Sequence, residues 1–285
     1  MGIDKKKILN ILKIIFQVFI VIALIVYLFP IIWSIIASFK TGADTFSFPP
    51  KIIFHPTLEA YKYVIQEMHI FDYLLNSIIT AGASTVIAII IAMFFAYALV
   101  RFNWRGKESI AFTLLTFKMM PAIAAIIPIY LLYTMPERFL GFNLVDTRIG
   151  LVLIYLFFNL PFSIWILRSF FEKIPKEIED AALVDGCSRT SMLFRIIIPM
   201  SRPGFVATAF FNLIFSWNEF LFALILTDQN ARTLPVEVSK LMTLRTILWN
   251  QMGVIAVFCL VPVVIFSIFA RNHLVTGLTL GSISE

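Results

Sequence analysis

The stretch Ile174-Pro-Lys-Glu-Ile-Glu-Asp-Ala-Ala-Leu-Val-Asp-Gly186 is a short charged segment in an otherwise strongly apolar chain. Pro175 suits the first position of a helix, where its missing N–H is not needed. The acidic residues that follow favour the positive end of the helix dipole. Gly186 can adopt positive φ and end this helix, and Ser188 can cap the next one. The stretch therefore predicts a helix, a sharp turn and a second helix.

The remainder of the chain is too apolar for a soluble domain. Of its 285 residues, 60% are hydrophobic and 14% are charged, and the mean hydropathy is +0.92. Soluble domains carry about 25% charged residues, so the apolar excess of this chain must face lipid. The net charge of +6 is typical of loops held on the cytoplasmic side of a membrane, and we expect no nucleic-acid partner.

Six segments are long and apolar enough to cross a bilayer, which takes about 20 residues. They cover residues 11–38, 74–100, 110–134, 149–167, 203–226 and 246–270. The first is much longer than the apolar core of a signal peptide, so we expect it to remain and to span. The sequence thus predicts an all-α membrane protein with one transmembrane domain over residues 1–285.

Basic residues orient the six spans. With both termini cytoplasmic, the inner segments hold fourteen Lys and Arg residues and the outer loops hold eight. Because cytoplasmic loops are enriched in basic residues, the 168–202 loop, which contains the opening stretch, is predicted to lie in the cytoplasm.

The predicted helix in this loop has two possible uses. Ala181 and Ala182 leave the backbone accessible to close packing, between the apolar anchors Ile178 and Leu183. Such a helix can lie in a groove of a partner protein. An amphipathic helix on the membrane surface, or one packed on its own bundle, fits the same residues.

The 168–202 loop resembles the cytoplasmic loop of ABC importer permeases, whose pattern is E-A-A-x-x-x-G-x9-I-x-L-P. Here Asp180-Ala181-Ala182 precedes Gly186, and nine residues later the chain reads Ile196-Ile-Ile-Pro199. Asp180 replaces the Glu of the pattern and Ile198 replaces its Leu. Both replacements keep the charge or the apolar character.

The resemblance extends to the maltose-type, sugar-importing branch of that family. Four further segments are similar to it: Met120-Pro121 followed by Pro128-Ile-Tyr130, Trp217-Asn-Glu-Phe220, Thr233-Leu-Pro-Val236 and Leu274-Val-Thr-Gly-Leu-Thr-Leu-Gly281. The resemblance implies a type I importer permease (MetI-like) fold with a cytoplasmic coupling helix, located in a bacterial-type cell membrane.

The same resemblance implies partners and coupling residues. Such a permease pairs with a second homologous permease, two ATP-binding subunits and an extracytoplasmic solute-binding protein. The residues that would contact the ATPase are Glu179, Asp180, Ala181, Ala182, Asp185 and Gly186. We expect ATP and Mg to bind the partner ATPase subunits, since this chain contains no G-x-x-x-x-G-K-[ST] phosphate loop.

Neither a catalytic centre nor a metal site is expected. Cys187 and Cys259 are far apart in the sequence, and the three histidines are scattered outside the apolar runs. We therefore interpret the chain as a transport subunit and not as an enzyme.

Polar residues recur at helical spacing in the fifth span. Thr208, Asn212 and Ser216 are four residues apart and Glu219 follows three later, so one face is polar. Polar groups at membrane depth usually face the interior of a bundle, where they can line a solute path or bond neighbouring helices. The predicted path residues are Lys118, Asn159, Asn212, Ser216, Asn218 and Glu219.

Lys118 is unusual because it falls within a predicted span. A lysine there costs about 2.5–3.5 kcal/mol on insertion scales. It can pair with Glu219, contact an anionic solute, or reach the inner surface through its long stem.

Two other classes of protein fit the predicted spans less well. An ion-driven secondary transporter needs carboxylates inside the membrane, and Glu219 is the one acidic residue within the predicted spans. A membrane enzyme needs a cluster of reactive side chains, which the spans lack. Within the importer class, an oligosaccharide, a monosaccharide or polyol, and a sugar phosphate or glycerophosphate all remain open as solutes.

Overall fold

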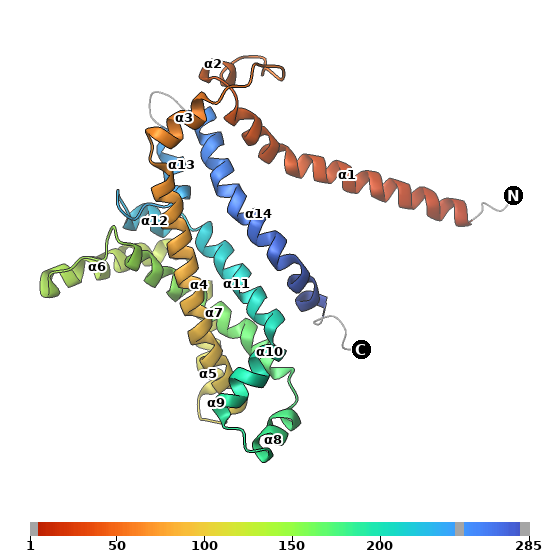
Figure 1. The fold of residues 1–285 in the computed structure, drawn as a ribbon, viewed down its shortest axis with the longest axis vertical. Helices are drawn as coiled ribbons and strands as arrows, with labels where there is room; N and C mark the ends of the chain where they lie inside the picture. The colour runs from red at the N-terminus through yellow and green to blue at the C-terminus, as the bar shows by residue number, and fades with distance from the viewer. Residues whose placement is uncertain (1–4, 243–247, 280–285) are drawn as a thin grey trace. The chain divides into compact units, whose positions relative to one another are not determined.

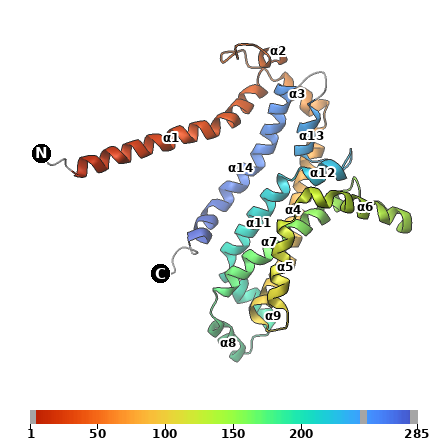
Figure 2. The same cartoon turned by 180° about the vertical axis from the view of Figure 1, so that it is seen from behind.

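The computed structural model describes residues 5–242 and 248–279. Within these residues the chain forms helices and no extended strand (Figures 1 and 2). The chain forms two compact units, residues 1–70 with 240–258 and residues 71–239 with 259–285. The start of the last predicted span, at 246, and the end of the tail segment, at Gly281, lie outside the described residues.

Four single helices are long and apolar enough to cross a membrane. They are α1 (Lys5–Ser38), α4 (Ile70–Arg101), α7 (Arg148–Glu172) and α14 (Trp249–Thr279). They correspond to the first, second, fourth and sixth predicted spans. The start of the 168–202 loop is corrected by the structure, because α7 continues to Glu172 before the chain turns.

The predicted spans 110–134 and 203–226 are not continuous helices. The first is α5 (Lys107–Met119) and α6 (Ala122–Leu140), bent by 97° at a break that contains Pro121. A proline lacks the N–H that would continue a helix. The second comprises α11 (Arg202–Trp217) and α12 (Leu221–Leu226), separated by three residues. Figure 1 shows α5 and α6 leaving their break in different directions.

Short helices fill the loops. The loop after α1 holds α2 (Gly42–Thr45) and α3 (Glu59–Gln66). The 168–202 loop holds α8 (Lys176–Val184), α9 (Arg189–Met192), a π-helical turn η1 (Leu193–Ile197) and α10 (Ile198–Met200), and the chain bends by 76° where α11 begins. After α12, α13 (Leu234–Lys240) follows.

In the unit formed by residues 1–70 and 240–258, the start of α14 packs closely on the end of α1. A Cβ placed on Gly253 would lie 2.7 Å from the Ser34 carbonyl oxygen and 2.9 Å from the Ser38 backbone nitrogen. Both atoms belong to the backbone and cannot rotate away. The contact therefore requires glycine at position 253.

In the unit formed by residues 71–239 and 259–285, α7 packs against both α5 and α11. On α4 the small residues Ser84, Ala88, Ala92 and Ala96 are fully buried, as expected for a stripe that lets another helix approach. One apolar core lies where α4, α7, α8 and η1 meet, and a second lies where α6, α7 and α12 meet.

Asp146, in the loop between α6 and α7, anchors the segment that follows α12. Its carboxylate accepts hydrogen bonds from the backbone N–H groups of Asp228, Gln229, Asn230 and Ala231, at 2.8–3.3 Å. Asp146 has φ of +56°, a conformation that aspartate tolerates better than most residues. Burial raises the pKa of this carboxyl, but the four N–H donors outweigh burial and hold the pKa below its usual value.

The same segment is bonded to the start of α4. The Asn76 amide donates to the carbonyl oxygens of Asn230 and Arg232, at 3.0 and 2.8 Å. Ser77 accepts the Leu234 N–H at 2.9 Å. The segment between α12 and α13 is therefore held as one piece by α4 and by Asp146.

Gly253→Ala should destabilise the folded chain by about 1–3 kcal/mol, because the new methyl group overlaps backbone atoms of α1. Gly82→Ala, on α4, is the matched control, since nothing lies within 4 Å of its added Cβ. Thermal unfolding of the detergent-solubilised protein measures both. Equal unfolding temperatures for the two variants would contradict the close contact.

Asp146→Asn should free the backbone of residues 228–231, because the amide supplies one acceptor oxygen in place of two charged ones. Hydrogen bonds to a charged group contribute about 1.5–3 kcal/mol, so amide exchange there should accelerate at least about tenfold at pH 7. In the unchanged protein the anchoring is complete above the usual Asp pKa, about 3.9. It is lost as pH falls through the lower pKa of folded Asp146.

Asp228→Asn is the control for this measurement, because the Asp228 side chain is 76% exposed and its ion pair with Arg232 is long, at 3.6 Å. Exposed ion pairs contribute about 0–1 kcal/mol. This substitution should leave the exchange rates of residues 228–231 unchanged. Slow exchange in Asp146→Asn would mean that the carboxylate does not anchor the segment.

Candidate functional site

The 168–202 loop has the local structure that its sequence predicts. Helix α8 runs from Lys176 to Val184, with Pro175 at its N-cap, one residue before the predicted position. Gly186 has φ of +84° and makes the turn. Ser188 caps α9 by accepting the Ser191 N–H at 3.2 Å.

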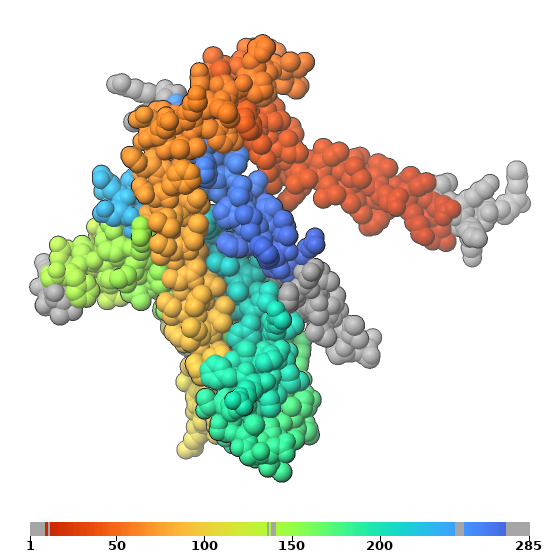
Figure 3. Space-filling view, in the orientation of Figure 1, coloured from red at the N-terminus to blue at the C-terminus, as the bar shows by residue number. Residues whose placement is uncertain are grey.

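The six predicted coupling residues divide between two faces. Asp180, Ala181, Asp185 and Gly186 are exposed, together with Leu183 and Val184. Glu179 and Ala182 are buried, at 5% and 7% exposure, and Ala182 belongs to the core shared by α4, α7 and η1. The green surface in Figure 3 contains the exposed face of this loop. The exposed residues alone are therefore accessible to a partner.

Glu179 is turned toward Arg101, the last residue of α4. The two side chains form an ion pair and are 7% and 6% exposed. This pair was not predicted, because in the sequence Arg101 is recognisable only as one basic residue of a predicted cytoplasmic segment. Long-range packing creates this contact between residues 78 positions apart.

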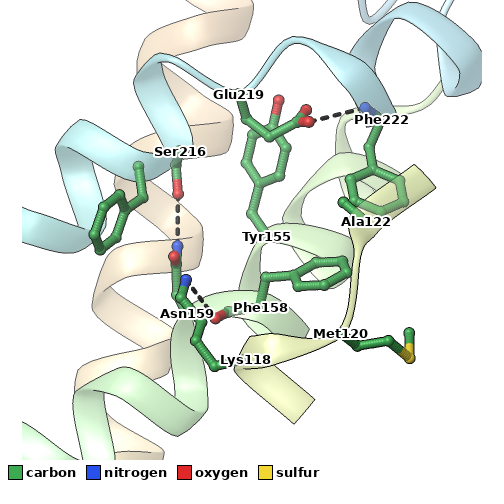
Figure 4. A pocket seen from close by; sticks show the side chains of 10 residues that line it. Lys118, Met120, Ala122, Tyr155, Phe158, Asn159, Ser216, Glu219 and Phe222 are labelled. Carbon is green, nitrogen blue, oxygen red and sulfur yellow. Dashed lines mark hydrogen bonds between the residues drawn. The ribbon is translucent and has the colours of Figure 1, made fainter. Parts of the chain in front are cut away.

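A pocket of about 250 Å³ lies beside the two breaks in the spans (Figure 4). The lining residues come from α5, α6, α7, α11, α12 and the two breaks: Lys118, Met120, Ala122, Tyr155, Phe158, Asn159, Phe215, Ser216, Glu219 and Phe222. Aromatic rings and a few polar groups thus share one concave surface, which is the usual composition of a small-molecule site.

The polar stripe on α11 serves mainly to bond helices together. Asn159 donates to Ser216 at 2.7 Å, and Asn212 donates to Ser163 at 2.7 Å. Ser216 also lies 3.2 Å from the Ser84 hydroxyl on α4. Of the two uses predicted for the stripe, helix–helix hydrogen bonding is confirmed, and Ser216 additionally lines the pocket.

Glu219 lies in the break between α11 and α12. Its carboxylate accepts the N–H groups of Phe222 and Ala223, at 2.8 and 3.0 Å, and so caps α12. Both groups would lack partners in an apolar environment. Figure 4 shows the Tyr155 side chain pointing toward the same carboxylate.

Lys118 does not pair with Glu219. Its ammonium lies 4.7 Å from the centre of the Phe215 ring and 5.9 Å from that of Phe162, as in cation–π contacts. It donates a long hydrogen bond to the Phe158 carbonyl, at 3.4 Å. Within the described part of the chain no carboxylate forms an ion pair with it.

The structure therefore brings together four of the six predicted path residues. Lys118, Asn159, Ser216 and Glu219 line the pocket. Asn212 is buried outside the lining, and Asn218 is exposed with its amide bonded to the Ile214 carbonyl of its own helix. The prediction omitted Tyr155 and the phenylalanines, because apolar rings in an apolar span carry no distinguishing pattern.

Metal chemistry has no support in the described residues, where no three His, Cys, Asp or Glu side chains are grouped to hold an ion.

Curated proteins resemble the chain along nearly its whole length. The probable ABC transporter permease protein y4oR of Sinorhizobium fredii is 35% identical over 95% of both chains. The trehalose/maltose transport system permease protein MalG of Thermococcus litoralis is 36% identical, over 91% of this chain and 92% of its own. The sulfoquinovosyl glycerol transport system permease protein SmoH of Agrobacterium fabrum is 32% identical, over 90% and 88%.

A solved structure shares the fold. A chain of a bacterial ABC transporter involved in the import of the acidic polysaccharide alginate superposes with a TM-score of 0.77. The match covers 96% of this chain and 99% of that one, at 23% sequence identity. The predicted all-α, type I importer permease fold is thus confirmed.

The family model described as "Binding-protein-dependent transport system inner membrane component" matches residues 84–279, which include the capped break at Glu219, the pocket and the 168–202 loop. The chain is a multi-pass membrane protein that belongs to this family.

Proposed function

We propose that this chain is the membrane-spanning permease subunit of an ATP-driven importer that takes up a sugar or sugar-like solute. The observation that carries the proposal is the 168–202 loop, a capped helix and a sharp turn that present an exposed, largely apolar and acidic face. The relatives named for sugar and sugar-glycoside transport support the choice of solute class.

Import by this chain would require partner subunits that hydrolyse ATP and deliver the solute. We propose a second homologous permease, two ATP-binding subunits that bind ATP and Mg, and an extracytoplasmic binding protein that delivers the solute. One related structure holds an alginate transporter in complex with a periplasmic protein bound to an alginate pentasaccharide. Both termini and the 168–202 loop then lie in the cytoplasm, in agreement with the distribution of basic residues.

The exposed face of α8 is the proposed contact with the ATPase. Leu183 and Val184 are 37% and 88% exposed, beside the carboxylates of Asp180 and Asp185. An amphipathic helix of this kind fits a groove in a partner. Closure of the ATPase dimer would then move the helices attached to α8 as rigid bodies.

The pocket is the proposed point at which this subunit contacts the solute. Aromatic rings such as Phe158 and Phe215 offer flat apolar faces, and Asn159 and Ser216 offer polar groups beside them. Lys118, at the edge, has no acidic partner among the described residues and can donate to a hydroxyl or an anionic group of the solute.

A secondary transporter driven by an ion gradient is the alternative class of function. It would use Glu219 for coupling, but both oxygens of that carboxylate accept backbone N–H groups at the start of α12. This structural role of Glu219 favours an external source of energy.

Ala181→Trp should uncouple ATP hydrolysis from uptake, because a large ring on the exposed face of α8 would block the groove. Reconstituted with its partner subunits in proteoliposomes, the variant should lose at least about tenfold in uptake rate, equal to about 1.4 kcal/mol. Ala182 is unsuitable for this test, because it lies in the chain's own core and a ring there would disturb packing.

The control for this substitution is Ala43→Trp in α2, an exposed alanine in the outer loop, which should leave uptake unchanged. Normal ATP-dependent uptake by Ala181→Trp would exclude α8 as the docking helix. Accumulation of solute by the purified chain without ATPase subunits would exclude the importer itself.

Lys118→Met should weaken solute transfer through the pocket, because it removes the cationic donor and retains much of the stem. The uptake rate at limiting solute should fall about tenfold, a loss of about 1.4 kcal/mol, while ATPase activity remains. Lys62→Met, on exposed α3, should leave uptake unchanged. Unaltered uptake by Lys118→Met would remove this lysine from the solute path.

A further inference from the structure

Arg101 joins three helices at the end of the bundle that carries the 168–202 loop. It is the last residue of α4, and its side chain is 6% exposed. Its Nε forms the ion pair with the Glu179 carboxylate of α8. A charge so deeply buried is tolerated only when it is paired and hydrogen-bonded.

The other arm of the guanidinium contacts the end of α7. Nη2 donates to the Phe171 carbonyl oxygen at 3.1 Å and to the Ile174 carbonyl oxygen at 2.9 Å. Carbonyl groups at the end of a helix lack partners within that helix. The Phe171 carbonyl accepts the Ile174 N–H of the connection at 3.2 Å, and Arg101 adds a side-chain donor to it. Arg101 also supplies a donor to Ile174, within the three-residue connection between α7 and α8.

Glu179 is held from a second side. The Tyr97 hydroxyl, one turn earlier on α4, lies 3.5 Å from the other carboxylate oxygen. Around this pair, Phe171, Ile174 and Ala182 belong to one apolar core with Tyr97. The polar contacts thus lie inside packed side chains, where water cannot replace them.

We infer that Arg101 is a positioning residue that locks the connection 173–175, so that α4, α7 and α8 move as one rigid lever. The inference rests on the proposed docking of α8 to an ATPase and explains how a docked helix would transmit force. Without the lock, α8 could pivot at Lys173–Pro175 while α4 and α7 stayed in place.

The guanidinium is suited to this task for a geometric reason. Its donors lie in one plane and point in different directions, so one side chain reaches a carboxylate on α8 and two carbonyls around the end of α7. A lysine ammonium at position 101 has a single nitrogen and cannot occupy both places. Arg101→Lys should therefore retain only part of the function.

The experiment measures solute uptake per ATP hydrolysed by the reconstituted importer, with trehalose and maltose as the first probes and glycosyl glycerols as the second. Arg101→Gln and Glu179→Gln should each lower this ratio at least tenfold while ATP hydrolysis continues. The double variant should lower it no further, since both substitutions break one contact. Arg101→Lys should give an intermediate ratio.

Arg168→Gln is the matched control. Arg168 lies near the end of α7 that Arg101 contacts. It pairs with Glu172 and Glu108, whose side chains are 48% and 65% exposed, and within the described part of the chain it forms no hydrogen bond or ion pair with α8. The ratio for this variant should remain that of the unchanged protein. Normal ratios in Arg101→Gln and Glu179→Gln would overturn the inference. If Ala181→Trp uncoupled the importer in the same preparations, the docking proposal would survive that result.

A second measurement leaves Arg101 and Glu179 unchanged and does not depend on the choice of solute. Spin labels are placed at Ile91 of α4 and Glu177 of α8, both exposed, with Cys187 and Cys259 changed to serine. The distance between the labels should be the same with and without ATP in the assembled complex. A change larger than one helical turn, about 5.4 Å, would overturn the rigid lever.

Discussion

A bilayer offers no hydrogen-bonding partner to a polar group, so every break in a membrane helix must be satisfied by the protein itself. This constraint explains the centre of the larger unit. The chain leaves its helix after Trp217, and the Glu219 carboxylate takes up two N–H groups of α12. At Pro121 the other broken span turns without needing an N–H from the proline. The breaks provide room for the pocket because helices end there.

The side chains around the breaks follow from the same requirement. Asn159, Ser216 and Ser84 bond one another across three helices, so most polar atoms near the pocket are already in use. Lys118 differs, because its ammonium contacts two aromatic rings and one carbonyl oxygen and forms no ion pair with a carboxylate among the described residues. A solute that reaches the pocket would therefore contact aromatic faces and the Lys118 ammonium, which can donate further hydrogen bonds.

At the end of the bundle that carries the 168–202 loop, buried polar groups are also paired within the protein, and this pairing connects α8 to the other helices. Arg101 donates to the Phe171 carbonyl of α7, to the Ile174 carbonyl of the connection and to the Glu179 carboxylate of α8 with one rigid group. The result is a helix, α8, whose inward face is fixed to the bundle and whose outward face is open. Fixed and open faces on one short helix are what a docking element requires, because it must be accessible and must also transmit movement.

Much of this molecule was determined by the sequence alone. Hydropathy located the four single helices long enough to span and the apolar segments that hold α5 with α6 and α11 with α12. The order Pro175, Gly186, Ser188 predicted the helix, turn and helix of the 168–202 loop, because these residues act through their own backbone within a few positions. Helical spacing also identified the polar face of α11. Three features became visible only in the folded chain: the two spans are broken, Glu219 caps α12 and does not pair with Lys118, and Arg101 forms an ion pair with Glu179. Each of these features depends on which residue, distant in the sequence, pairs with a buried charge or with an unpaired backbone N–H or carbonyl. Residue spacing along one helix does not contain that information.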